Sequence, residues 1–148
     1  MKKYLFIIVL ACIAIVNAAY LSLKAYEISQ GVDPSATISL LTAVCDINDT
    51  FSCTDALADP LSRPFGIPFP YIALVVYPVL LIIALVGYLK RSYTCAKALA
   101  VLSFLGICFN GYIITMETFY IRAYCPLCLF CSAIIITIFI TSLLILRD

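Results

Sequence analysis

The stretch CPLCLFCSAIIITIFITSLLIL, Cys125 to Leu146, joins three cysteines at three-residue spacing to a long uncharged apolar run. About 20 helical residues cross a hydrocarbon core of roughly 30 Å, and this run is long enough to do so. Three further runs of similar length and character lie at residues 4–23, 71–89 and 98–118. The sequence therefore predicts four transmembrane helices, the last of them at residues 126–146.

The composition of the chain excludes an ordinary soluble domain. Of its 148 residues, 65% are hydrophobic and only 11% are charged, a balance that soluble globular domains do not show. Residues 24–70 form the only long connection between the predicted spans. We therefore predict an all-α integral membrane protein with a single membrane domain, residues 1–148. Its architecture would be a four-transmembrane-helix bundle with a long exterior loop between the first and second helices.

The distribution of positive charge predicts the orientation, since Lys and Arg concentrate in cytoplasmic connections. Four spans place most of the basic residues on one side of the membrane, namely Lys2, Lys3, Lys90, Arg91, Lys97 and Arg147. The other side keeps Lys24, Arg63 and Arg122. We expect a multi-pass protein of the cell inner (cytoplasmic) membrane with both termini cytoplasmic. The alternative, a cleaved secretory signal at the amino end, leaves the long loop on the exterior side as well.

The cysteines divide into two groups by their predicted surroundings. Cys95 lies by a cytoplasmic connection, while Cys12 and Cys108 lie inside spans, where a thiol behaves as a small hydrophobic group. The others lie at or just below the exterior side, where disulfides persist; they are Cys45, Cys53, Cys125, Cys128 and Cys131. Redox chemistry is expected in this exterior group.

Cys125 and Cys128 form a C-x-x-C motif at the start of the fourth predicted span. Pro126 suits the first position of a helix, because the hydrogen-bond donor that proline lacks would have no helical partner there. The helix N-terminus and nearby Arg122 favour a thiolate, and residues three apart share a helix face. Such a pair can open and close a disulfide. Cys131 lies about 4.5 Å deeper by helical rise and is expected to pack.

Thiols at this depth can meet a water-soluble protein disulfide from above and a lipid-soluble redox carrier, such as a quinone, from the side. The chain has no histidine, carboxylate pair or nucleophile triad, so no metal site of the usual zinc or haem kind is predicted. Membrane lipid is the expected surrounding, and nothing predicts nucleic-acid binding.

Two alternative functions remain. One is a soft-metal protein that binds or transports copper or mercury through Cys125, Cys128 and Cys131; the other is an assembly protein with inert disulfides.

Polar residues within and beside the spans have two interpretations each. Asn17 and Asn110 lie nearer mid-membrane than the exterior edge, so we interpret them as bundle-packing residues and place them outside the predicted site. Glu117 either relays a proton or lies among headgroups. Arg63 and Arg122 either hold anionic groups by charge or anchor the interface.

Three segments, taken in order, resemble the vitamin K epoxide reductase family over nearly the whole chain. They are CDINDTFSC at residues 45–53, RPFGIP at residues 63–68 and CPLC at residues 125–128. The resemblance implies a four-helix bundle around a quinone near the exterior membrane surface. The disulfide bond formation protein B family also has four spans and two exterior cysteine pairs, but its C-x-x-C lies in the first exterior loop.

The resemblance also implies an electron path. Cys45 would exchange disulfides with a reduced thioredoxin-fold carrier, Cys53 would exchange with Cys125, and Cys128 would face the quinone, either ubiquinone or menaquinone. The carrier would be a separate polypeptide on the exterior side, because a fused thioredoxin-like domain is absent here. The implied enzyme is a quinone-dependent thiol-disulfide oxidoreductase that supports disulfide bond formation in exported proteins.

Differences from the animal members of that family bear on the substrate. Those members carry a tyrosine four residues after the second active cysteine, where this chain has Ser132. They also carry an asparagine near the start of the second span, where this chain has Pro70 or Tyr71. Both differences argue against vitamin K epoxide as the substrate. Candidate walls of the quinone pocket are the aromatic residues Phe65, Phe69, Tyr71, Phe119 and Phe130.

Overall fold

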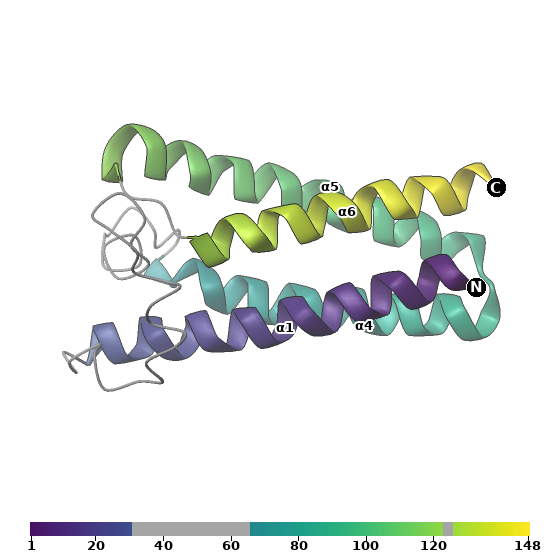
Figure 1. Cartoon of the computed structure of the whole chain (residues 1–148), viewed down its shortest axis with the longest axis horizontal. Coiled ribbons are helices and arrows are strands. Elements are labelled where there is room, and N and C mark those ends of the chain that lie inside the picture. The colour runs from purple at the N-terminus through teal and green to yellow at the C-terminus, as the bar shows by residue number, and fades with distance from the viewer. Residues whose placement is uncertain (31–65, 123–125) are drawn as a thin grey trace.

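The computed structural model describes residues 1–30, 66–122 and 126–148, and no strand occurs among them. The long helices are α1 (Lys2–Ser29), α4 (Phe69–Lys90), α5 (Tyr93–Met116) and α6 (Pro126–Arg147), and a π-helical turn, η4 (Glu117–Ile121), extends α5 (Figure 1). Each of the four is long and apolar enough to cross a membrane. The predicted all-α membrane bundle with four transmembrane helices is therefore confirmed. Four predicted site residues lie outside the described residues: Cys45, Cys53, Phe65 and Cys125.

Prolines and backbone geometry set the helix boundaries near the site. Pro68 precedes α4 with an extended backbone, and Pro70 occupies its first turn, where a missing donor costs no helical hydrogen bond. Pro126 is the first residue of α6, as the sequence predicts. At its other end α4 stops at Arg91, whose left-handed backbone (φ 48°) cannot continue a helix.

Three helices contain a predicted span and extend past it, and the predicted span at residues 98–118 lies within α5 and η4 together. The largest differences are at the end of α1, which continues to Ser29 rather than residue 23, and at the start of α5, which begins at Tyr93 rather than at residue 98. Hydropathy marks only the part of a helix that lies in the hydrocarbon of the membrane. The helical backbone continues beyond that part into more polar residues. The membrane-spanning run is therefore shorter than the helix that carries it.

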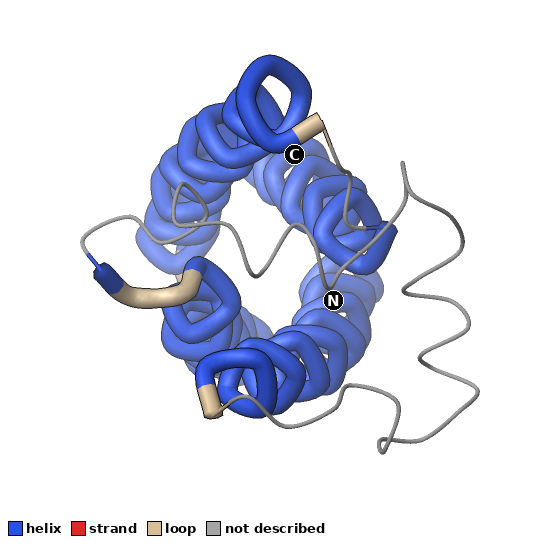
Figure 2. Tube along the Cα trace, turned by 90° about the vertical axis from the view of Figure 1, so that its left-hand side faces the viewer, coloured by secondary structure: helices blue, strands red, loops and turns tan. Residues whose placement is uncertain are grey.

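The helices alternate in direction and form a closed ring of contacts. Figure 1 shows both termini at one end of the bundle, while α4 and α6 begin at the opposite end. Helix α1 packs against α4 and α6, and α5 packs against the same two helices. Figure 2, which looks along the bundle, shows the four helices around a common axis. This is an up-down-up-down topology.

The core combines large aliphatic side chains with small residues where helices approach closely. Ile7, Leu80, Leu99 and Ile138 are fully buried. Alanines accompany them on the same surfaces, and they are Ala14, Ala18, Ala84 and Ala96. Small side chains allow transmembrane backbones to come close, which increases the dispersion contacts that hold such bundles together.

Candidate functional site

A cavity of about 320 Å³ lies between the helices in the half of the bundle where α4 and α6 begin. Its volume falls in the range of small-molecule pockets, roughly 300–1,000 Å³. All four long helices contribute to its wall, through residues that include Leu21 of α1, Phe69 and Tyr77 of α4, Asn110 of α5, and Cys128 and Cys131 of α6. Among the described residues that line the cavity, none is Lys, Arg, Asp or Glu. The cavity therefore suits a neutral, mostly apolar ligand.

Cys128 is the predicted catalytic residue that the structure places on this cavity. It is the third residue of α6, two positions after Pro126. Its side chain is 4% exposed and belongs to a cluster with Leu21, Phe69 and Ile113 from the other three helices. A thiol near a helix N-terminus lies at the positive end of the helix dipole, which favours the thiolate that disulfide exchange requires.

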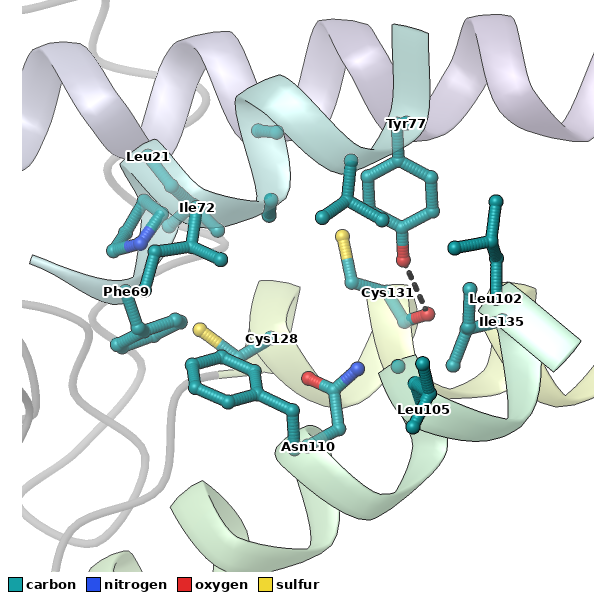
Figure 3. A pocket seen from close by; sticks show the side chains of 16 residues that line it. Leu21, Phe69, Ile72, Tyr77, Leu102, Leu105, Asn110, Cys128, Cys131 and Ile135 are labelled. Atoms are coloured by element: carbon teal, nitrogen blue, oxygen red, sulfur yellow. Dashed lines mark hydrogen bonds between the residues drawn. The ribbon is translucent and has the colours of Figure 1, made fainter. Parts of the chain in front are cut away.

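Cys131 lies one turn deeper in α6 and also lines the cavity (Figure 3). Asn17 of α1 donates hydrogen bonds from Nδ2 to Cys131 Sγ and to the Leu127 carbonyl, each at 2.9 Å. The Tyr77 hydroxyl of α4 donates to the Cys131 carbonyl at 3.1 Å. Two neighbouring helices therefore fix the first turns of α6. Cys131 is buried, and the prediction that it packs rather than reacts stays a prediction.

Two residues of this region, Asn17 and Asn110, are not among the predicted site residues. Asn17 contacts the start of α6, and Asn110 points into the cavity from α5 (Figure 3). Asn17 follows Ala14 by three residues and precedes Leu21 by four, so it lies on the buried face of α1. The signal that the sequence itself offers is a polar residue within an apolar span. A polar side chain on the interior face of a transmembrane helix is a candidate functional residue.

Only one of the predicted aromatic wall residues that the structure describes lies on the cavity. Phe69 is buried there at the start of α4. Tyr71 does not line it, and Phe119 and Phe130 are 71% and 48% exposed on the outer surface of the bundle. Phe130 follows Cys128 by two residues, a rotation of about 200° around the helix, so it points away from the cavity.

Ser132 makes a local contact rather than adding to the cavity wall. Its hydroxyl donates to the Cys128 carbonyl at 3.0 Å, one turn back along α6. The hydroxyl therefore satisfies a backbone acceptor of its own helix. The position that carries tyrosine in the animal proteins offers no polar group to this cavity.

Two buried charged residues, Lys24 and Glu117, are found in the helices that end near the same side of the bundle. Lys24 is 2% exposed and Glu117 is 0% exposed, so other parts of the protein cover both side chains. The backbone N–H of Arg122 donates to the Glu117 carbonyl at 2.7 Å and closes the π-helical turn. Such turns often occur at functional sites. A proton-relay role for Glu117 stays a prediction.

No metal site is formed by the described side chains. Within residues 1–30, 66–122 and 126–148, no group of three or more His, Cys, Asp or Glu side chains is placed to hold an ion. The soft-metal alternative needs Cys125, which lies outside those residues. The neutral, apolar character of the cavity does not favour it.

The fold and the cavity define a class: a multi-pass membrane protein that brings a helix-start thiol to an apolar pocket between its helices. A family model described as the vitamin K epoxide reductase family matches residues 5–143. The chain belongs to the vitamin K epoxide reductase family, and the resemblance seen in the sequence is confirmed. No curated protein gives a significant match. Members of this family are membrane thiol-disulfide oxidoreductases that use quinones, and membership shows that this chain is an oxidoreductase in general.

Proposed function

We propose that the chain is a thiol:quinone oxidoreductase that passes electrons from a reduced thioredoxin-fold carrier to a membrane quinone, ubiquinone or menaquinone. The observation that carries the proposal is Cys128, a thiol of a C-x-x-C motif, in the wall of an apolar cavity between transmembrane helices. Membership of a family of quinone-using thiol oxidoreductases supports it. The physiological role would be to maintain disulfide bond formation in exported proteins.

The cavity fits the head of a quinone by its chemistry and its size. Its lining is apolar apart from the Asn110 amide, the Tyr77 hydroxyl and the two cysteine sulfurs, which suits a ring with two carbonyl groups. Phe69 and the aliphatic side chains around it would hold the ring, and Cys128 would face it. When bound, a quinone supplies an acceptor for two electrons and two protons.

The cysteines carry electrons to that acceptor through two disulfide exchanges and one oxidation. A carrier thiolate attacks the Cys45–Cys53 disulfide; the carrier leaves as a disulfide, and both loop cysteines become thiols. Cys53 then attacks the Cys125–Cys128 disulfide, so that the loop disulfide forms again and the two motif thiols are released. Oxidation of these thiols closes the Cys125–Cys128 disulfide and delivers two electrons and two protons to the quinone.

The proposed direction and sidedness follow from the same chemistry. A strongly oxidising protein carrier can be regenerated only by a stronger acceptor, and membrane quinone fulfils that requirement. We place both termini in the cytoplasm and the cavity toward the exterior side of the inner membrane. The cavity lies in the half of the bundle where α4 and α6 begin. Figure 1 shows both termini at the other end, which supports placing the cavity and the termini toward opposite sides of the membrane.

Quinone reduction by the purified protein tests the proposal. The assay supplies a reduced thioredoxin-fold carrier and compares wild type with alanine variants of Cys45, Cys53, Cys125 and Cys128. All four variants should lose turnover with the carrier, whereas C45A and C53A should still reduce quinone when dithiothreitol is the donor. Dithiothreitol reaches the C-x-x-C pair directly and so bypasses the loop.

Two results would contradict the proposal. The first is that wild type reduces neither ubiquinone nor menaquinone with any thiol donor. The second is that turnover continues unchanged without Cys125 and Cys128. Cys12→Ala is the matched control, because Cys12 is an exposed thiol on the bundle surface and not part of the cavity.

A further inference from the structure

Asn110 is a polar residue of the cavity wall that the proposed thiol chemistry leaves without a role. Its side chain extends from α5 into the cavity, and Cys128 of α6 is part of the same wall (Figure 3). An amide brings two donors and an acceptor into a space that is otherwise almost entirely hydrocarbon. An amide in such surroundings is unfavourable unless it forms hydrogen bonds. Its presence therefore points to a polar group in the cavity.

The other polar groups nearby already have partners within the protein. The Tyr77 hydroxyl donates to the Cys131 carbonyl at 3.1 Å, and Cys131 Sγ accepts a hydrogen bond from Asn17 at 2.9 Å. Within the parts of the chain that the structure describes, no hydrogen bond of the Asn110 amide is found. Its hydrogen-bonding capacity is directed at whatever occupies the cavity.

We propose that Asn110 recognises and orients the quinone head by donating a hydrogen bond from its amide to one carbonyl oxygen. The inference rests on the proposed function and adds a binding residue from α5 to it. A ring anchored at Asn110 is held between α5 and α6, the helix that carries Cys128. The hydrogen bond thereby places the electron acceptor beside the thiol that reduces it.

An asparagine suits this task in both redox states of the ligand. Its amide donates to a quinone carbonyl, and after rotation of the amide its oxygen accepts from a hydroquinone hydroxyl. It does so without a net charge, which would be costly within the membrane. A donor aimed at the carbonyl also stabilises the negative charge that develops on that oxygen during reduction. Asn110 therefore favours rings that carry a carbonyl over apolar molecules of similar size.

Equilibrium binding of two probes to the purified full-length protein in detergent tests this inference. The probes are dimethylnaphthoquinone and dimethylnaphthalene, which has the same rings without carbonyl groups. Asn110→Leu keeps a side chain of similar size and removes the hydrogen bond. We expect it to weaken quinone binding about tenfold, which corresponds to 1.4 kcal/mol, and to leave dimethylnaphthalene binding unchanged.

Infrared difference spectra of bound dimethylnaphthoquinone give a second readout that is independent of activity. A hydrogen bond lowers the stretching frequency of the carbonyl that accepts it. The bound quinone should show one carbonyl band shifted to lower frequency in wild type. In N110L that band should return toward the position of the unbound molecule.

Thr115→Val is the matched control, because it removes a hydroxyl from an exposed position of the same helix. It should bind both probes like wild type. Asn110→Ala replaces N110L if the leucine variant has a lowered thermal midpoint. Equal loss of both probes in the Asn110 variants, or a wild-type carbonyl band without a shift, would overturn the inference. Absence of quinone binding by wild type would instead refute the proposed function.

Discussion

Replacing Asn17 with leucine removes two hydrogen bonds that fix the start of α6. The Asn17 amide donates to the Leu127 carbonyl and to Cys131 Sγ, each at 2.9 Å. Hydrogen bonds between transmembrane helices contribute about 0.6 kcal/mol each on average, so Asn17→Leu should lower the free energy of unfolding by about 1.2 kcal/mol. That loss is a roughly sevenfold change in the equilibrium between folded and unfolded protein.

Reversible unfolding in mixed micelles, with increasing amounts of denaturing detergent and circular dichroism as the signal, measures this difference. Ser22→Ala is a matched control on the same helix. Ser22 is buried, and its hydroxyl has no hydrogen-bond partner among the described residues. Its removal should change the free energy of unfolding by less than about 0.5 kcal/mol.

Equal destabilisation by N17L and S22A, or unfolding of N17L at the wild-type midpoint, would refute the reasoning, since the bonds to α6 would then contribute nothing. A local readout accompanies the global one. Cys131 should react faster with a membrane-permeant maleimide in N17L than in wild type, because the first turns of α6 are less firmly held. In S22A the labelling rate should stay at the wild-type value.

Three further predictions concern the cavity itself. Cys128→Ala should abolish quinone reduction, measured by quinone absorbance, whereas Cys12→Ala should keep the wild-type rate; residual turnover in C128A would contradict this. Phe69→Ala should raise the KM for quinone several-fold by removing a buried wall residue. Phe130→Ala removes a ring from the outer surface and should leave the KM unchanged. An equal rise in KM for both variants would argue against placing Phe69 on the cavity and Phe130 on the outer surface. Gly106→Val should weaken dimethylnaphthoquinone binding, because even a Cβ there would lie 3.1 Å from a side-chain carbon of α6; unchanged affinity would show that the cavity tolerates the added bulk.

The four helices can be predicted from the sequence because the membrane leaves the backbone few choices. An apolar run in hydrocarbon must satisfy its own N–H and C=O groups, and a helix does so within one segment. The start of α6 can also be predicted from the sequence, since proline is accommodated in the first helical turn without the loss of a helical hydrogen bond, and Pro126 lies there. The start of α5 at Tyr93 cannot be predicted in this way, because no change in hydropathy marks where a helix begins outside the hydrocarbon.

The face that each helix turns toward the cavity is harder to predict. Transmembrane helices are apolar on all sides, so no polar stripe separates the inner face from the outer one. Phe119 and Phe130 therefore resemble wall residues in the sequence but lie outside, while Asn110 resembles a packing residue but lines the cavity. The depth of a residue in the membrane is also a poor guide to whether it lines the cavity. The cavity extends inward from Phe69 to Tyr77, about 12 Å of helical rise.

The neutral lining of the cavity determines where charge can appear in the proposed reaction. Lys24 and Glu117 are buried but are not among the described residues that line the cavity. A charged ligand would lose its hydration there without meeting a counter-charge, whereas a neutral quinone loses little. In the proposed cycle, negative charge forms first on thiolates, and Cys128 lies where the α6 dipole stabilises it. The charge that then develops on the bound carbonyl needs a donor that is itself neutral, and the Asn110 amide is such a donor within the described wall.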